Sequence, residues 1–110
     1  MKETQLGAFE EVILLLVGIL DEEAYAMRIG EEFEQQTGRP VSIGAVHSTL
    51  NRIQDKGFLR SDMGAATAKR GGRRKRIYKI TGEGQRALAA AKDFKMALWN
   101  QFPDFNINFI

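Results

Sequence analysis

The chain has 110 residues, of which 44% are hydrophobic, and its formal net charge at pH 7 is +2. This length predicts a single domain with a core of modest size. The chain has no cysteine, which excludes a disulfide framework and thiolate chemistry, and its single histidine, His47, argues against a metal cluster. We therefore expect neither a metal nor a cofactor.

The apolar run Val12–Leu20 holds nine residues, which is too short to span a bilayer. Three glutamates and one lysine precede it, and this is not the pattern of a signal peptide. We therefore expect a cytoplasmic protein that does not enter a membrane.

Charge is divided unevenly along the chain. Residues 1–36 contain nine acidic and two basic residues, whereas residues 39–79 contain eleven basic and two acidic ones. The small overall charge therefore conceals an acidic N-terminal third and a basic middle. Only the basic middle is suited to an anionic partner.

The first expected helix covers Leu6–Leu20. It contains no proline and is apolar on almost every side, which predicts burial on most faces. In so small a domain, burial of this kind often requires a second copy of the chain. Asp21 is the expected N-cap of a second helix over 22–37, which ends at Gly38 before the extended link that Pro40 imposes.

A third helix is expected over Ile43–Lys56, with Ser42 as its N-cap and Gly57 at its end. Its remaining faces carry short or polar side chains and few of the lysines and glutamates that usually cover a helix facing only water. The apolar residues that recur at helical spacing are Ile43, Val46, Leu50 and Ile53.

Two short β-leaning runs follow, Phe58–Met63 and Lys75–Thr81, and Gly64–Arg74 joins them as a long hairpin tip that contains glycines. Thr81 is the expected cap of a last helix over 82–101, which Pro103 terminates. The apolar stripe of this helix contains Leu88, Ala91, Phe94 and Leu98.

The most basic segment is Lys69–Arg76, in which six of eight residues are cationic and two are glycine. None of these charges has an acidic neighbour in the sequence, so the segment does not belong to a core. Arginine side chains match phosphate oxygens, and neutralised phosphates release their counterions. Nucleic acid is therefore the natural partner, with an ordinary solubilising loop as the alternative interpretation of the segment alone.

The order helix, helix, helix, hairpin, helix predicts a mainly α protein with a small β-hairpin, arranged as a winged helix-turn-helix that is followed by a C-terminal helix. In this arrangement the third helix enters the major groove and the hairpin tip, the wing, follows the DNA backbone or the neighbouring minor groove. The candidate DNA contacts of the third helix are Ser42, His47, Ser48, Thr49, Asn51 and Arg52. Those of the wing are Lys69, Arg70, Arg73, Arg74 and Lys75.

Several short segments follow one another in an order and spacing that are specific in combination. They are Val17–Leu20, Glu23–Ala26, Thr37–Val46, Ser48–Ile53, Lys56–Leu59 and Gly71–Gly84. Together they resemble the PadR-like bacterial transcriptional regulators over most of the chain, from about Leu6 to Leu88. The resemblance implies a homodimeric DNA-binding repressor whose last helix mediates dimerisation, with a contribution from the first.

The chain departs from the family pattern at two positions, with His47 where tyrosine is usual and Ala26 where glycine is usual. Its short end resembles the small subclass, in which some members bind flat aromatic drugs between two subunits through a tryptophan of the last helix. Trp99 matches that residue, so the resemblance implies a small aromatic ligand as a further partner. Simple packing in a dimer interface is the alternative role for this indole.

We therefore predict a winged-helix DNA-binding domain over 1–81, a dimerisation helix of the same compact unit over 82–102 and a tail over 103–110. The predicted function is a homodimeric repressor of a pseudo-palindromic operator, relieved by a small aromatic effector. One alternative is a winged-helix protein–protein adaptor without sequence-specific DNA binding, which would use the acidic N-terminal third. Another is a small-molecule-binding dimer in which DNA contact is secondary. The sequence offers no activated nucleophile, phosphate-binding glycine loop or metal cage, so we do not expect an enzyme.

Overall fold

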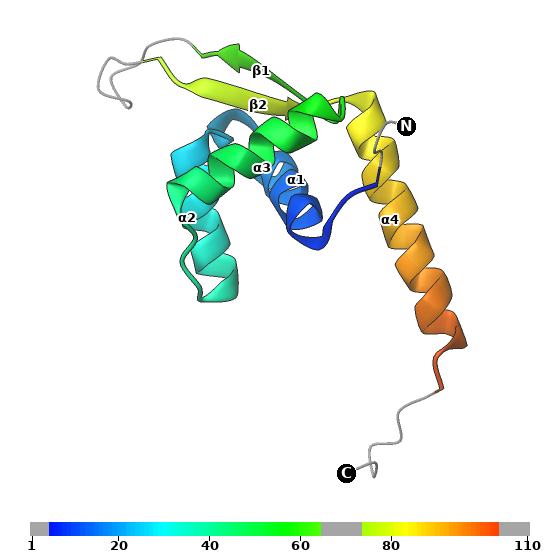
Figure 1. The fold of residues 1–110 in the computed structure, drawn as a ribbon. Coiled ribbons are helices and arrows are strands. Elements are labelled where there is room, and N and C mark those ends of the chain that lie inside the picture. The colour runs from blue at the N-terminus through cyan, green and yellow to red at the C-terminus, as the bar shows by residue number, and fades with distance from the viewer. Residues whose placement is uncertain (1–4, 65–73, 104–110) are drawn as a thin grey trace.

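The computed structural model of the protein describes residues 5–64 and 74–103. Three helices are packed together, a two-stranded hairpin lies along one side of them, and a long last helix extends away (Figure 1). In chain order the elements are α1 (Ala8–Leu20), the 3-10 turn η1 (Asp21–Glu23), α2 (Ala26–Thr37), α3 (Ile43–Asp55), β1 (Leu59–Met63), β2 (Arg76–Ile80) and α4 (Gly82–Gln101). The predicted winged helix-turn-helix is confirmed.

The core lies where α1, α2 and α3 meet beneath the hairpin. The rings of Phe9 and Phe33 pack in a T-shaped arrangement, with centroids 5.4 Å apart, and join the start of α1 to the second half of α2. The buried apolar side chains include Ile13, Leu14, Leu16, Val17, Ile29, Val46, Leu50, Ile53, Phe58, Leu59 and Tyr78. Their helical spacing within each of the three helices is the pattern that the sequence carries.

The hairpin is fixed to the helices at its base. β1 and β2 pair antiparallel, with Leu59 opposite Ile80 and Met63 opposite Arg76. The Tyr78 backbone N–H also donates to the Ala24 carbonyl at 2.9 Å, which ties β2 to the segment before α2. The base of the wing therefore has a defined position relative to the helix-turn-helix.

The start of α4 is anchored by Thr81, which is confirmed as its cap. The Thr81 hydroxyl accepts from the Gly84 backbone N–H at 3.0 Å and donates to the Gly57 carbonyl at 2.7 Å. The Thr81 N–H donates to the Phe58 carbonyl at 3.0 Å. One residue thus caps α4 and attaches it to the link between α3 and β1.

The predicted start of the second helix was wrong. Asp21 has a φ of 51° and opens the 3-10 turn, while α2 begins at Ala26 after Tyr25, which makes no side-chain cap. The physical reason is Ala24, which is fully buried and whose carbonyl accepts from β2, so the backbone is not helical there and is extended at Tyr25. The predicted end of the helix is confirmed, since Gly38 adopts the left-handed conformation with a φ of 75°.

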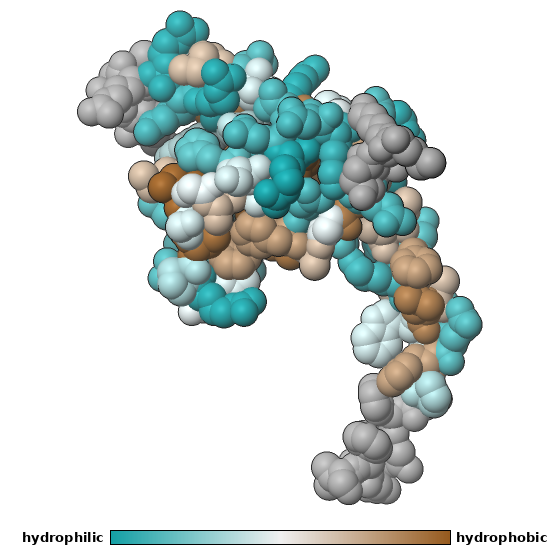
Figure 2. Space-filling view, in the orientation of Figure 1, coloured by the Kyte–Doolittle hydropathy of each residue, from teal (hydrophilic) through white to brown (hydrophobic). Residues whose placement is uncertain are grey.

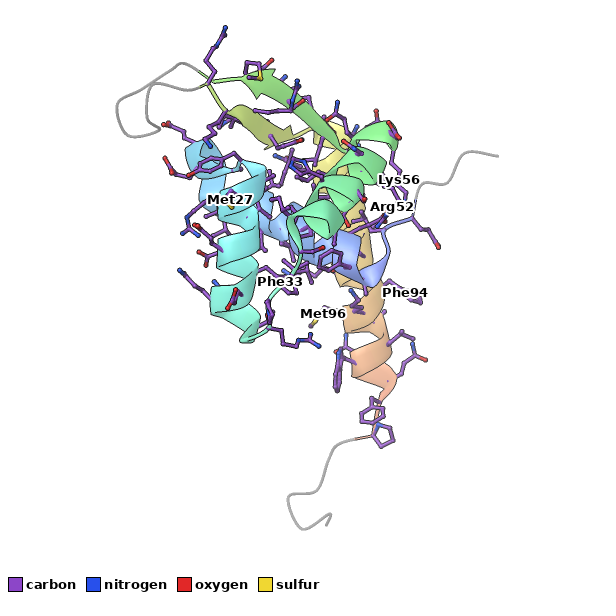
Figure 3. The ribbon with its side chains drawn as sticks, turned by 60° about the vertical axis from the view of Figure 1, so that its left-hand side comes forward. Met27, Phe33, Arg52, Lys56, Phe94 and Met96 are labelled. Carbon is purple, nitrogen blue, oxygen red and sulfur yellow. The ribbon has the colours of Figure 1, made fainter. Side chains whose placement is uncertain are left out.

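Two apolar surfaces stay exposed within one subunit. α1 leaves Val12, Leu15 and Ile19 partly exposed, so its predicted burial on most faces is incomplete in a single chain. Apolar side chains also follow α4 where it leaves the body (Figure 2), and Figure 3 labels two of them, Phe94 and Met96. The predicted apolar stripe of α4 is therefore present, but a single subunit does not cover it.

Candidate nucleic-acid interface

The exposed face of α3 begins at its cap. Ser42 accepts from the Ala45 backbone N–H at 3.1 Å, which confirms the predicted cap and leaves the helix N-terminus open to solvent. His47, Ser48 and Asn51 are exposed on the helix beyond it. These four predicted contacts thus share one accessible side of α3, where polar groups can reach base edges or phosphates.

The expectation that Thr49 contacts DNA is corrected. Its side chain is 2% exposed, and its hydroxyl accepts from Arg52 Nη2 at 3.2 Å. Thr49 lies on the same face as Val46 and Ile53, at the spacing of a buried stripe. It is therefore a polar member of the core side of α3.

Arg52 is accessible but engaged. Its side chain is 55% exposed, while its Nε donates to Glu10 Oε2 at 3.3 Å. Lys56, one turn later, donates from Nζ to Glu10 Oε1 at 2.7 Å and to the Gln5 carbonyl at 2.6 Å. Figure 3 shows both side chains beside the start of α1. The end of α3 is thus tied to α1 by one carboxylate.

The Glu10 carboxylate is ionised by its surroundings. Burial opposes its charge, but hydrogen bonds from Lys56, the Gly7 backbone N–H and Arg52 outweigh burial and hold the pKa of Glu10 below its ordinary value. Because Arg52 and Lys56 are each more than forty residues from Glu10 in the chain, no local pattern in the sequence indicates this contact.

The base of the wing carries two of its predicted cations. Arg74 is exposed and donates from Nε to the Gly64 carbonyl at 3.3 Å. The Lys75 ammonium lies 5.4 Å from the centre of the Tyr25 ring, at a distance suited to a cation–π contact. The predicted contacts Lys69, Arg70 and Arg73 lie outside the described residues.

A cleft of about 250 Å³ joins α3 to the wing. Ile43 and His47 line it from α3, and Arg74 and Lys75 line it from the hairpin. The exposed side of α3 and the cationic base of the wing therefore face a common space. Hydrophilic residues dominate the hairpin surface on this side of the molecule (Figure 2).

Six residues that line the cleft were not among the predicted contacts: Tyr25, Ala26, Met27, Ile43, Arg76 and Tyr78. Helical spacing grouped Ile43 with the buried residues of α3, yet its side chain is 45% exposed. Its position in the helix is the signal that could have indicated exposure. A residue directly after the cap precedes the turn of α3 that packs on α1 and α2.

Trp99 lies on α4 and does not line this cleft. Its indole is 62% exposed and packs edge-on against Phe102, with ring centroids 5.6 Å apart. A groove of about 420 Å³ between α1 and α4 is lined by Leu15, Met96 and Trp99, among others. Lys95 of α4 forms an ion pair with Glu11 of α1 across this groove.

Other classes of site find no support in the described part of the chain. Residues 5–64 and 74–103 contain no group of three or more His, Cys, Asp or Glu side chains able to hold a metal ion. In the same residues, no helix is both long enough and apolar enough to cross a membrane.

Comparison with known proteins agrees with this geometry. The model of the transcriptional regulator PadR-like family matches residues 14–90. No curated protein matches the sequence at a significant level.

Several solved structures share the fold. The complex structure of hsRosR-S4 is 28% identical in sequence, with a TM-score of 0.63 over 91% of this chain and 77% of that one. A PadR family transcription regulator from Clostridium difficile is 27% identical, with a TM-score of 0.60 over 83% of this chain and 96% of that one. A PadR-like transcriptional regulator from Bacillus cereus, at 22% identity, has a TM-score of 0.69 over 86% of this chain and 87% of that one.

The family match covers α2, α3 and the hairpin, which line the cleft, together with the second half of α1 and the start of α4. Members of this family are DNA-binding regulators of transcription and are not enzymes. The chain therefore belongs to the PadR-like family of transcriptional regulators.

Proposed function

We propose that the protein is a homodimeric repressor that binds a pseudo-palindromic operator in double-stranded DNA. The observation that supports this most is the shared cleft, because it allows α3 and the wing of one subunit to meet the same duplex. Two α3 helices of a dimer would read half-sites about one helical turn, roughly 34–36 Å, apart. Repression would follow from competition with RNA polymerase for the promoter, in the cytoplasm.

In this proposal, some exposed residues of α3 contact bases and others contact phosphates. The Asn51 amide is suited to pair bidentately with adenine, and His47 and Ser48 offer single hydrogen bonds. Ser42 holds the helix N-terminus, where backbone N–H groups favour a phosphate. Arg52 remains a candidate because its guanidinium is half exposed, and a phosphate would compete with Glu10 for it.

The wing supplies contacts that do not depend on base sequence. Arg74 and Lys75 stand at its base. The other predicted contacts, Lys69, Arg70 and Arg73, lie outside the described residues. Each phosphate that such a side chain neutralises makes affinity fall more steeply with salt.

Replacing Arg74 and Lys75 together by alanine should weaken binding to every duplex and flatten the plot of log affinity against log salt by about 1.8, or about 0.9 for each lost phosphate contact. Fluorescence anisotropy from 50 to 300 mM salt gives the slope, and Arg86→Ala on α4 is the control for the loss of one exposed charge. An unchanged slope would remove the base of the wing from the interface. A protein that shifts no genomic fragment would instead favour the adaptor function.

We place the dimer contact on α1 and α4 in this proposal. Val12, Leu15 and Ile19 form an exposed stripe on α1 at helical spacing. α4 and the residue that follows it expose a further set, which comprises Phe94, Met96, Leu98, Trp99 and Phe102. Exposed apolar surface of this extent on a small chain is typical of an interface between subunits.

The groove beside Trp99 is the proposed effector site. Its lining combines the flat indole with the apolar Leu15, Leu88 and Met96 and with the Glu11 carboxylate. Such a lining suits a planar aromatic cation, which would stack on the ring and lie near the carboxylate. A ligand bound between the subunits would change operator affinity by favouring one spacing of the two α3 helices over another.

Leu15→Glu should convert the dimer to a monomer in sedimentation at micromolar concentration, because a carboxylate would enter an apolar contact. Met27→Glu is the matched control, since Met27 is exposed but lies on α2, away from the stripe. A planar aromatic cation should quench Trp99 fluorescence in the wild-type dimer and far less in an Ile19→Glu monomer, because Ile19 lies on the same stripe but does not line the groove. A wild-type protein that sediments as a monomer would contradict the dimer, and equal quenching in both proteins would contradict the effector site.

A further inference from the structure

The cleft between α3 and the wing contains two exposed apolar side chains. Met27 is 56% exposed and Ile43 is 45% exposed, and both line this cleft. Neither belongs to the apolar stripes of α1 and α4. Most of the other residues that line the cleft are charged or aromatic, so the two side chains lie in a surface that is otherwise suited to DNA.

Ile43 is the first residue of the recognition helix. It directly follows the Ser42 cap and lies one turn before His47, so the two side chains share a face of α3. In helix-turn-helix proteins, the N-terminal residues of this helix contact base edges. Arg74 and Lys75 stand across the cleft and would engage the adjacent backbone.

The chemistry of the side chain restricts what it can recognise. Isoleucine has no polar atom, so it cannot read the hydrogen-bonding groups of a base. The major groove presents one apolar group, the C5-methyl of thymine. The phosphates that the cationic side of the cleft attracts would hold that methyl group near the start of α3.

We propose that Ile43 contacts the C5-methyl group of a thymine in each half-site and selects a T·A pair at that position. This inference rests on the proposed function, because it requires that the protein bind an operator through α3. It adds a specificity-determining residue to the polar contacts of the same helix. Met27 belongs to α2, the helix that crosses the backbone in such complexes, and we assign it no base.

The test uses an operator selected by the wild-type protein from random duplexes. Each thymine is replaced in turn, in both half-sites, by deoxyuridine, which lacks only the C5-methyl group. At one position this replacement should weaken wild-type binding about fourfold for each half-site, the effect expected for one buried methyl group. On that deoxyuridine duplex, Ile43→Ala should weaken binding little further. On the thymine duplex, Ile43→Ala should weaken binding at least as much as deoxyuridine weakens that of the wild type.

Met63→Ala is the matched control, since Met63 is also 45% exposed but lies on β1 and does not line the cleft. It should keep the full sensitivity to deoxyuridine. Thermal unfolding of Ile43→Ala should match that of the wild type, because the side chain lies outside the core.

Two kinds of failure are distinguishable. If no duplex is selected, the proposed function fails and the inference falls with it. If an operator is selected and bound, but no thymine is sensitive or the losses from deoxyuridine and Ile43→Ala multiply independently, the inference is overturned and the proposed function stands.

Discussion

Gly84→Ala is expected to lower the free energy of unfolding by about 2 kcal/mol, within the range for overpacking a close contact. A Cβ atom at this position would lie 2.3 Å from the Phe58 carbonyl oxygen and 2.9 Å from Ile80 Cγ2. The oxygen cannot retreat freely, because it accepts the Thr81 N–H at 3.0 Å. The substitution must therefore displace the start of α4.

Gly82→Ala provides the matched control. A Cβ atom there would have its nearest neighbour, Arg86 Nη1, at an ordinary 3.6 Å. Because alanine also favours a helix over glycine, this variant should be as stable as the wild type or slightly more so. Urea midpoints measured at one protein concentration compare the three proteins, since the stability of a dimer depends on concentration.

The Gly84→Ala variant should also bind the operator more weakly. α4 carries much of the proposed dimer contact, so a change in its direction alters the spacing of the two α3 helices. A Gly84→Ala protein with the wild-type midpoint would show that the link between α3 and β1 yields easily, contrary to the tight contact described above.

Local signals in the sequence located most of the helix ends. Ser42 and Thr81 cap the helices that follow them, and Gly38 ends α2, because each residue type has a preference that acts within a few residues. Asp21 failed as a cap because a contact between Ala24 and β2, made far along the chain, sets the conformation there. Propensity could not anticipate that contact.

In the candidate site too, local sequence signals predict some features, while others depend on contacts between residues far apart in the chain. Helical spacing predicts the exposed face of α3. The same spacing places Thr49 on the buried side, because Thr49 shares a stripe with Val46 and Ile53. The cleft itself could not be predicted, because it depends on how the hairpin is attached to the segment before α2. The pairing of Arg52 and Lys56 with Glu10 was equally hidden, since charge counts do not say which partners meet.

Glu10→Gln is expected to lower the free energy of unfolding by about 2 kcal/mol at pH 7. Breaking a buried pair costs roughly 3–5 kcal/mol, and exposure of Arg52 to water reduces that figure here. Lys56, whose side chain is 15% exposed, would lose its counter-charge and keep only the Gln5 carbonyl. The glutamine amide would also present an N–H group to a cation.

The difference between the two proteins should depend on pH. The folded protein holds the pKa of Glu10 below its ordinary value near 4.5, so the unfolded chain binds the proton more readily. The stability that this carboxylate contributes is therefore complete above the unfolded value and is lost as the pH falls through the lower, folded one. Urea midpoints from pH 7 to pH 3 should accordingly converge in the acid range.

Glu31→Gln removes the same charge from an exposed position on α2 and controls for net charge. A double-mutant cycle with Lys56→Met separates the pair from its surroundings, because the coupling energy of contacting residues is about 0.5–3 kcal/mol. Additive losses in this cycle, or a gap between wild type and Glu10→Gln that stays constant down to pH 3, would show that Glu10 does not act through the charge of Lys56. Coupling between Glu10 and Lys56 that disappears as the carboxylate is protonated would show that the charge of Glu10 holds α3 against α1.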